Sequence, residues 1–370
     1  MNKLQTDLLQ LLRCGLWQDK QLAFSLHDVA WNELYQLAKE QCVIGVVADS
    51  FRLLEEKQCS GDEKLRSLGY VVRLEQKNRY VNELVYKLFH KFQAMGLSPV
   101  LMKGQAFAAN YSYSLHRQCG DIDIYFKYRD DCEKAVTWAT KGNKKLAEPS
   151  ENKRKCKHFT FDIDGNVIEL HYFMCLFANN RLQHRLQQII DNEFAQSEPF
   201  YVFIEGKQIE TVPPTLSVLH QIIHISKHLL EAGIALRQIC DLGLYLNKHS
   251  NVIDKERLNA YLDELELKSI AKSLGYILVD KLGLQEDSLP FVSNGQYADF
   301  ILGEILEGGN FGKKRVEYRE ESSVWLRKLK SVLYFYKRCK LYQPLMPSES
   351  KSYFWNKIKL NVKLIIKHHY

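Results

Sequence analysis

Two aspartates stand one residue apart inside an apolar run, in the stretch GDIDIYF of residues 120–126. A β-strand would point Ile122 and Ile124 to one face and Asp121 and Asp123 to the other, because strand side chains alternate. Like charges that share a strand face repel each other, and aspartate is a poor strand former. A strand with this sequence therefore requires a positive group against its acidic face.

A third acid with the same character occurs in NVIELHYF, where Glu169 lies between Ile168 and Leu170 and shares its predicted strand face with His171. An acid in such a strand is costly to bury unless a positive group lies against it. Although a lone DxD is common on surface strands, three carboxylates on neighbouring strands indicate one shared positive group. A divalent metal ion fits this role, because Mg²⁺ prefers oxygen ligands and pairs of metal ions assist phosphoryl transfer.

The segment before the acidic strand carries features of an anion site. LSPVLMKG reads as a strand that ends at Lys103 and Gly104, and QAFAANYS reads as a helix that begins there. Glycine and a helix N-terminus allow a phosphate to approach the backbone closely, and Lys103 adds a positive charge. Arg117 and Gly120 come directly before Asp121. Arg117 has the fork geometry that binds phosphate or holds a carboxylate, and an ordinary salt bridge is its alternative role.

Hydrophobic periodicity divides the chain into three parts. Residues 1–96 read as helices, residues 97–210 alternate strands and helices around a hairpin turn at Asp164–Gly165, and residues 211–370 read mainly as helices after the TVPPT boundary. The sequence therefore predicts an α+β fold. A small mixed-sheet domain is embedded between N-terminal helices and a larger C-terminal helical region.

In combination, these motifs resemble the nucleotidyltransferase superfamily with the DNA polymerase β-type palm, and within it the bacterial uncharacterised nucleotidyltransferase family. Gly104 matches the first superfamily element, Asp121–Ile124 the Dh[DE]h element, and Ile168–Leu170 the third, acidic element. The chain departs from the superfamily pattern at Gln105, where Gly or Ser is usual, and in its longer spacing to Asp121. The resemblance spans roughly residues 20–250.

The resemblance implies a palm fold and an enzyme that transfers NMP from an NTP to an acceptor and releases pyrophosphate. Asp121, Asp123 and Glu169 would hold Mg²⁺ or Mn²⁺, and Glu169 is also a candidate acceptor for the proton of the attacking group. His171 would orient Glu169. The implied phosphate-binding residues are Lys103, Gly104, Arg117 and Gly120.

The helical region after the palm carries His220, His224 and His228 at i, i+4 and i+8, on one helix face. Histidines on an apolar face are usually core residues, and a zinc site is the alternative, although no fourth ligand is evident. The resemblance implies instead that this region helps to bind the nucleotide. Its candidate pocket residues are Lys227, His228, Arg237 and Asp241. Arg237 and Asp241 are spaced to pair with each other.

Positive charge is concentrated at the C-terminal end. Residues 311–370 contain 15 Lys and Arg against 4 Asp and Glu, whereas the whole chain has a net charge of +7. A solvated helix face explains this pattern most simply. The alternatives are a nucleic-acid acceptor bound by this segment, a non-catalytic, antitoxin-like regulatory module, and a tail that lies on a membrane surface. The glycine-rich stretch 307–315 lacks the Walker A spacing and reads as a loop.

Nine cysteines without a CxxC pair, and an N-terminus without a signal-peptide pattern, lead us to expect reduced thiols and a cytoplasmic location. The sequence does not identify the acceptor or the preferred base.

Overall fold

The computed structural model describes residues 1–19, 26–55, 58–142, 157–309 and 324–367. In these residues the strands form one six-stranded sheet in the order β3-β4-β2-β1-β6-β5. Strand β2 runs parallel to β4 and β1 runs parallel to β6, while the other neighbouring strands are antiparallel. The strands are β1 (Pro99–Leu101), β2 (Ile122–Phe126), β3 (His158–Ile163), β4 (Asn166–His171), β5 (Phe200–Ile204) and β6 (Lys207–Thr211).

Two hairpins with the same turn chemistry build the sheet edges. Asp164 and Gly165 join β3 to β4 with φ angles of 50° and 77°, the left-handed pair that a type I′ turn requires. This turn is the one predicted from the sequence. Glu205 and Gly206 join β5 to β6 with φ angles of 47° and 79°. The second hairpin was not predicted, although its Glu-Gly turn also lies between two alternating runs.

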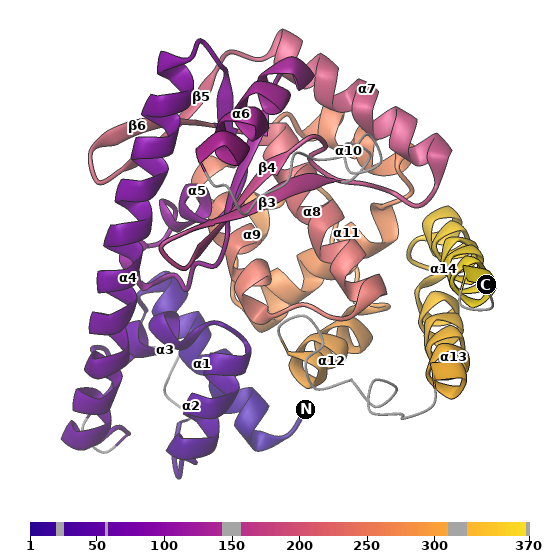
Figure 1. Cartoon of the computed structure of the whole chain (residues 1–370). Coiled ribbons are helices and arrows are strands. Elements are labelled where there is room, and N and C mark those ends of the chain that lie inside the picture. Colours follow the sequence, from indigo (N-terminus) through magenta and orange to yellow (C-terminus); the bar gives the residue numbers. More distant parts are fainter. Residues whose placement is uncertain (20–25, 56–57, 143–156, 310–323, 368–370) are drawn as a thin grey trace.

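The remaining elements are helices, which surround the sheet (Figure 1). Ser60 caps the long helix α4 through a hydrogen bond from the N–H of Glu63, and the helix ends before Gly96, as predicted. Helix α11 continues into a π-helical turn, Ile277–Lys281. The helices are α1 (Lys3–Trp17), α2 (Trp31–Glu40), α3 (Ile44–Ser50), α4 (Gly61–Ala94), α5 (Gln105–Ala108), α6 (Arg129–Gly142), α7 (Asn180–Gln196), α8 (Pro214–Glu231), α9 (Leu236–His249), α10 (Lys255–Glu264), α11 (Lys268–Tyr276), α12 (Ala298–Gly308), α13 (Val324–Tyr342) and α14 (Pro347–Lys367).

The two faces of the sheet contribute to different cores. Ile122, Ile124 and Phe126 of β2 are buried in a core with side chains of α4 and α6. Tyr125, one residue out of phase, belongs to the larger core that includes helices α1, α8 and α9. The α+β fold predicted from the sequence is confirmed, with the mixed sheet between N-terminal and C-terminal helices. The face of β2 that carries the acids is the face turned toward the C-terminal helices.

The last two helices form a hairpin that contacts the segment between β4 and α7 through the buried side chain of Glu349. Glu349 of α14 accepts hydrogen bonds from the backbone N–H groups of Ala178 and Asn179, at 2.8 and 3.0 Å, just before α7 begins. Asn179 also donates to Ser352 Oγ at 2.9 Å. The hairpin thereby anchors the connection that follows β4.

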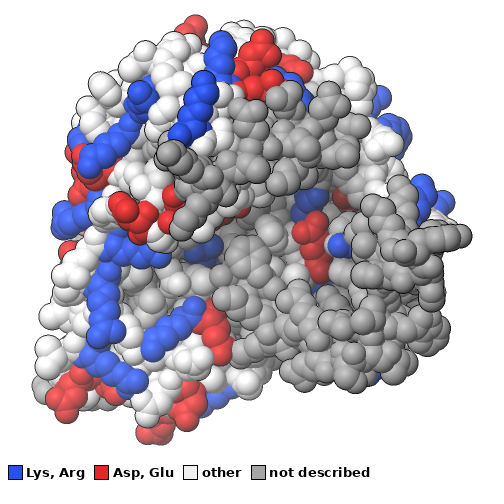
Figure 2. Space-filling model, viewed as in Figure 1, with Lys and Arg blue, Asp and Glu red and all other residues white. Residues whose placement is uncertain are grey.

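Charge on the described surface is mixed. In Figure 2, Lys and Arg side chains are interspersed with Asp and Glu over the described elements on the left of the view. On α13 and α14 the exposed lysines include Lys337, Lys340 and Lys351, and Tyr336 and Trp355 are half exposed. Most of the glycine-rich stretch 307–315 lies outside the described residues. None of the helices in the described part of the chain has the length and apolar character that crossing a bilayer requires.

Candidate active site

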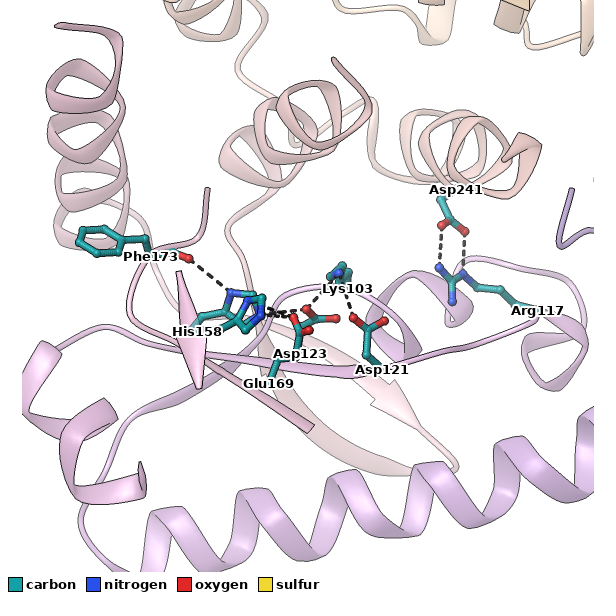
Figure 3. Close-up of polar contacts among 9 residues, drawn as sticks. Lys103, Arg117, Asp121, Asp123, His158, Glu169, Phe173 and Asp241 are labelled. Carbon is teal, nitrogen blue, oxygen red and sulfur yellow. Dashed lines mark hydrogen bonds and ion pairs between the residues drawn. The ribbon is translucent and has the colours of Figure 1, made fainter. Parts of the chain in front are cut away.

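The pairing of β2 with β4 brings the predicted acids together. Asp123 lies opposite Glu169 in the parallel register, and both side chains point away from the α4–α6 core. Carboxylate oxygens of Asp121, Asp123 and Glu169 lie within 4.8 Å of one another. Figure 3 shows the three carboxylates close to one another and to Lys103. The strand alternation predicted from the sequence therefore produces one acidic cluster.

Lys103 provides the positive charge that this cluster requires. Its Nζ atom lies 3.0 Å from Asp123 Oδ1 and 3.5 Å from Asp121 Oδ2 (Figure 3). Burial lowers the pKa of Lys103, but the charges of Asp123 and Asp121 outweigh burial and raise it above its usual value. Burial likewise acts to raise the pKa of Asp123, while Lys103 and His171 hold it well below its usual value. All the charges in this pair are therefore retained at neutral pH.

Two histidines extend the cluster along β3 and β4. His171 Nε2 lies 2.9 Å from Asp123 Oδ1 and 3.2 Å from Glu169 Oε2. His158 Nδ1 lies 3.3 Å from Glu169 Oε2. Burial lowers the pKa of His158, so this ring is neutral at pH 7. His171 is where the sequence placed it, beside Glu169. His158 was missed, although counting back from the Asp164–Gly165 turn places it opposite His171.

Neutral, hydrogen-bonding side chains of α8 and α9 lie on the other side of Lys103. A small cavity there is lined by Lys103, Phe107, His220, Gln221, His224, Ile225, Gln238 and Asp241. Within the described residues, both amide atoms of Gln221, Oε1 of Gln238 and Nδ1 of His220 are buried without a hydrogen-bond partner. Buried polar atoms normally have partners, so this wall has unused capacity to bind a polar group. Gln221 and Gln238 were not singled out from the sequence, because an isolated glutamine carries no local signal.

Helix α8 also gives the protein a built-in acid sensitivity. Burial, with Lys157 and Lys103 nearby, lowers the pKa of His220 to about 3. Below pH 6.5 the unfolded chain binds a proton at His220 that the folded chain excludes. The free energy of unfolding therefore decreases as the pH is lowered from about 6.5 to about 3. We expect His220 alone to cost about 2–3 kcal/mol of unfolding free energy between pH 7 and pH 4.5. Urea unfolding at both pH values measures this loss.

The matched variants for this experiment are His220→Gln and His184→Gln, because His184 is an exposed histidine on α7. The pH dependence of stability should be shallower in His220→Gln and unchanged in His184→Gln. If the free energy of unfolding depends on pH equally in His220→Gln and the unmodified protein, the pKa of His220 is not lowered by folding.

Arg117 takes the salt-bridge role that the sequence offered as the alternative to a phosphate contact. Its Nε and Nη2 atoms each donate to Asp241 at 2.7 Å, and Nη1 lies 3.2 Å from Cys119 Sγ (Figure 3). Asp241 also accepts a hydrogen bond from Tyr111 at 2.7 Å. The predicted pairing of Asp241 with Arg237 is wrong, because Arg237 Nη1 donates to the carbonyl of Gln118. A buried guanidinium requires a paired carboxylate, and Arg117 takes the one available from α9.

The other predicted phosphate and pocket residues also have structural contacts. Gly104 has φ 66° and ψ −112°, a conformation restricted to glycine, but the predicted helix after it is only the single turn α5. Ala106 packs in the core with α4 and α6, and Phe107 packs in the larger core with α8 and α9. Lys227 donates to the carbonyl of Leu176. A Cβ atom at Gly120 would have free space, so no contact requires glycine there.

His228 lies on the face of α8 that also carries His220 and His224. Burial and the charge of Lys103 lower its pKa to about 3. The described residues contain two clusters with metal-binding potential: Asp121 with Asp123 and Glu169, and Glu169 with His158 and His171. The zinc alternative for His220, His224 and His228 is therefore not supported by this part of the chain.

Known proteins resemble this chain to different degrees. A solved structure of an antigenic nucleotidyltransferase-like protein from Paracoccidioides brasiliensis is 12% identical, over 58% of this chain and 94% of that one. The TM-score of 0.32 is too low to support an inference. Comparison with curated proteins gives no match. The sequence model of a family described as uncharacterised nucleotidyltransferase matches residues 27–281, more than half of the chain and all three acids. The protein therefore belongs to this nucleotidyltransferase family.

Proposed function

We propose that the protein transfers NMP from an NTP to an acceptor group with the help of Mg²⁺ or Mn²⁺, and releases pyrophosphate. The observation that carries this proposal is the register of β2 and β4, which gathers Asp121, Asp123 and Glu169 into one cluster. Family membership supports the class of reaction. A buried carboxylate cluster that shares one lysine has the composition of a site for divalent cations.

The residues present fit a bound metal ion. Asp123 is only 1% exposed, and its Oδ2 atom has no hydrogen-bond partner within the described residues. An ionised oxygen in this position is costly unless a cation occupies the space beside it. Asp121 is 39% exposed, which leaves the cluster open to solvent on one side. The metal ion would neutralise charge on the triphosphate and help to ionise the attacking group.

Each side chain then has a definite part in the proposed reaction. Asp121, Asp123 and Glu169 would bind the metal, and Lys103 would provide a fixed positive charge for the phosphates. Glu169 is also placed to accept the proton of the attacking group, and His171 orients it from 3.2 Å. The open hydrogen-bonding atoms of Gln221 and Gln238 would contact an uncharged part of the nucleotide or acceptor.

The test is to incubate the purified protein with each α-labelled NTP, MgCl₂ or MnCl₂, and a cell extract as the source of acceptor. We expect the label to move to a new product together with pyrophosphate release, and both signals to disappear with EDTA. Omitting the extract distinguishes transfer to an acceptor from transfer to the protein itself. If none of the four NTPs gives label transfer or pyrophosphate with either metal, the proposal is wrong.

A further inference from the structure

A second set of metal-binding atoms lies beside the acidic cluster, and it contains nitrogen. His158 of the edge strand β3 stands directly opposite His171 of β4 in the antiparallel register. The two rings are 5.0 Å apart between centroids and meet edge to face. Glu169, two residues before His171, lies on the same strand face. One ligand atom from each of the three residues lies within 4.8 Å of the other two.

The two separations that involve Glu169 match the shell of a four-coordinate ion. A tetrahedral zinc ion about 2.0–2.2 Å from its nitrogen and oxygen ligands separates neighbouring ligand atoms by about 3.3–3.5 Å. Glu169 Oε2 lies 3.3 Å from His158 Nδ1 and 3.2 Å from His171 Nε2. These separations differ from the tetrahedral values by about 0.3 Å or less.

The contacts around the two imidazole rings are compatible with a metal ion between them. His171 Nδ1 lies 3.3 Å from the carbonyl oxygen of Phe173, which can only accept a hydrogen bond (Figure 3). On the other side of the ring, Nε2 lies 2.9 Å from Asp123 Oδ1 and 3.2 Å from Glu169 Oε2, so a metal ion would take the place of the proton between these atoms while Nδ1 keeps its contact with the carbonyl. His158 Nδ1 is buried and has no hydrogen-bond partner within the described residues. A carbonyl behind the ligating histidine is the usual outer contact of a metal-bound imidazole.

Asp123, a member of the acidic cluster, borders this second set of atoms. It is 1% exposed, its Oδ1 atom lies 2.9 Å from His171 Nε2, and its Oδ2 atom has no partner in the described chain. Lys103 contacts Asp121 and the same Oδ1 atom of Asp123, which leaves Oδ2 without a partner. Asp123 Oδ2 and His158 Nδ1 are therefore two buried atoms of this region that have no hydrogen-bond partner among the described residues.

We infer that His158, Glu169 and His171 form a second metal site, selective for a divalent ion of the zinc class. Two imidazoles and one carboxylate favour zinc, cobalt or a similar ion over Mg²⁺, which prefers oxygen ligands alone. Three protein ligands leave the fourth position of the ion open to water or to a substrate atom, the arrangement of catalytic zinc sites. The inference rests on this geometry and not on the proposed nucleotidyl transfer, although both sites share Glu169.

Cobalt is the probe for this site, because four-coordinate Co²⁺ absorbs visible light strongly and Mg²⁺ does not absorb. The full chain is stripped with a chelator and titrated with CoCl₂ in millimolar MgCl₂, without nucleotide. We expect one Co²⁺ per chain with a four-coordinate spectrum, and competition by stoichiometric Zn²⁺. Absence of this spectrum, or complete displacement of Co²⁺ by the Mg²⁺ present, would overturn the inference.

The variants separate this site from the acidic cluster. His158→Ala and the more conservative His158→Gln should weaken Co²⁺ binding by more than the about 10- to 100-fold that loss of an outer contact costs. His184→Ala, at an exposed histidine of α7, should bind Co²⁺ normally. Circular dichroism confirms that each variant is folded. Normal Co²⁺ binding by both His158 variants would overturn the inference.

A crossed measurement distinguishes failure of this inference from failure of the proposed function. Asp121 is outside the nitrogen-containing set, so Asp121→Asn should keep Co²⁺ binding while it loses Mg²⁺-dependent NTP consumption. Loss of Co²⁺ binding in Asp121→Asn would mean that the acidic cluster holds the ion, and it would contradict the second site. The NTP measurement alone bears on the proposed transfer.

Discussion

Replacing Asp123 with asparagine is expected to lower the rate of Mg²⁺-dependent NTP consumption by about 1,000-fold or more. Asp123 is the buried member of the acidic cluster, and it contacts both Lys103 and His171. A metal ion provides several kcal/mol of charge stabilisation in the transition state, and each 1.36 kcal/mol is a factor of ten in rate. Pyrophosphate release at saturating NTP, followed over a range of MgCl₂ concentrations, measures the loss.

The control is Asp287→Asn, which makes the same chemical change at an exposed aspartate far along the chain. Its rate should equal that of the unmodified protein. Asp123→Asn should remain folded, because Lys103 keeps Asp121 as a partner. Thermal unfolding of both variants tests this. A folded Asp123→Asn protein with an unchanged rate would show that the acidic cluster does not bind the metal used in the reaction.

The second large effect concerns stability. Asp241→Ala should lower the free energy of unfolding by about 3–5 kcal/mol, because it leaves the charge of Arg117 buried without a partner. Arg117 and Asp241 are only 5% and 3% exposed, and two hydrogen bonds of 2.7 Å join them. Tyr111 would lose its acceptor in the same variant. Urea unfolding at pH 7 gives the difference directly.

Two further proteins make this result interpretable. Glu264→Ala breaks the exposed ion pair with Arg185, and it should cost less than about 1 kcal/mol. The double variant Arg117→Met/Asp241→Leu removes both buried charges and should recover most of the lost stability. If Asp241→Ala is no more costly than Glu264→Ala, Arg117 has found another partner. A raised KM for NTP in the stable double variant would indicate that Arg117 also contacts the phosphates, as first predicted.

The members of the acidic cluster were predictable from the sequence because strand alternation is local, whereas the parallel pairing of β2 with β4 that gathers them joins segments far apart in the chain. Alternation within DIDI and IEL fixes which side chains share a face, and the Asp164–Gly165 turn fixes the register of β3 and β4. The long amphipathic helices and the TVPPT boundary are also local signals. These patterns were sufficient for the α+β class and for the three carboxylates.

Contacts between distant segments were not predictable in this way. Asp241 pairs with Arg117 at a separation of 124 residues, instead of with Arg237 four residues away. The choice depends on which charge is buried by the packing of α9 against α5, and no periodicity encodes it. For the same reason Gln221 and Gln238 gave no signal, since their importance comes only from the cavity that they line beside Lys103.

The Glu349 contact has a consequence for the order in which the protein is completed during synthesis. The connection that leaves β4 obtains its hydrogen-bond acceptor from a residue made 171 positions after Ala178. Domains fold largely as the chain emerges, so the sheet and its acids are in place before this acceptor exists. During that interval the two N–H groups at the start of α7 depend on water. The segment that follows β4 is therefore completed in two stages, separated by the translation of helices α8 to α13.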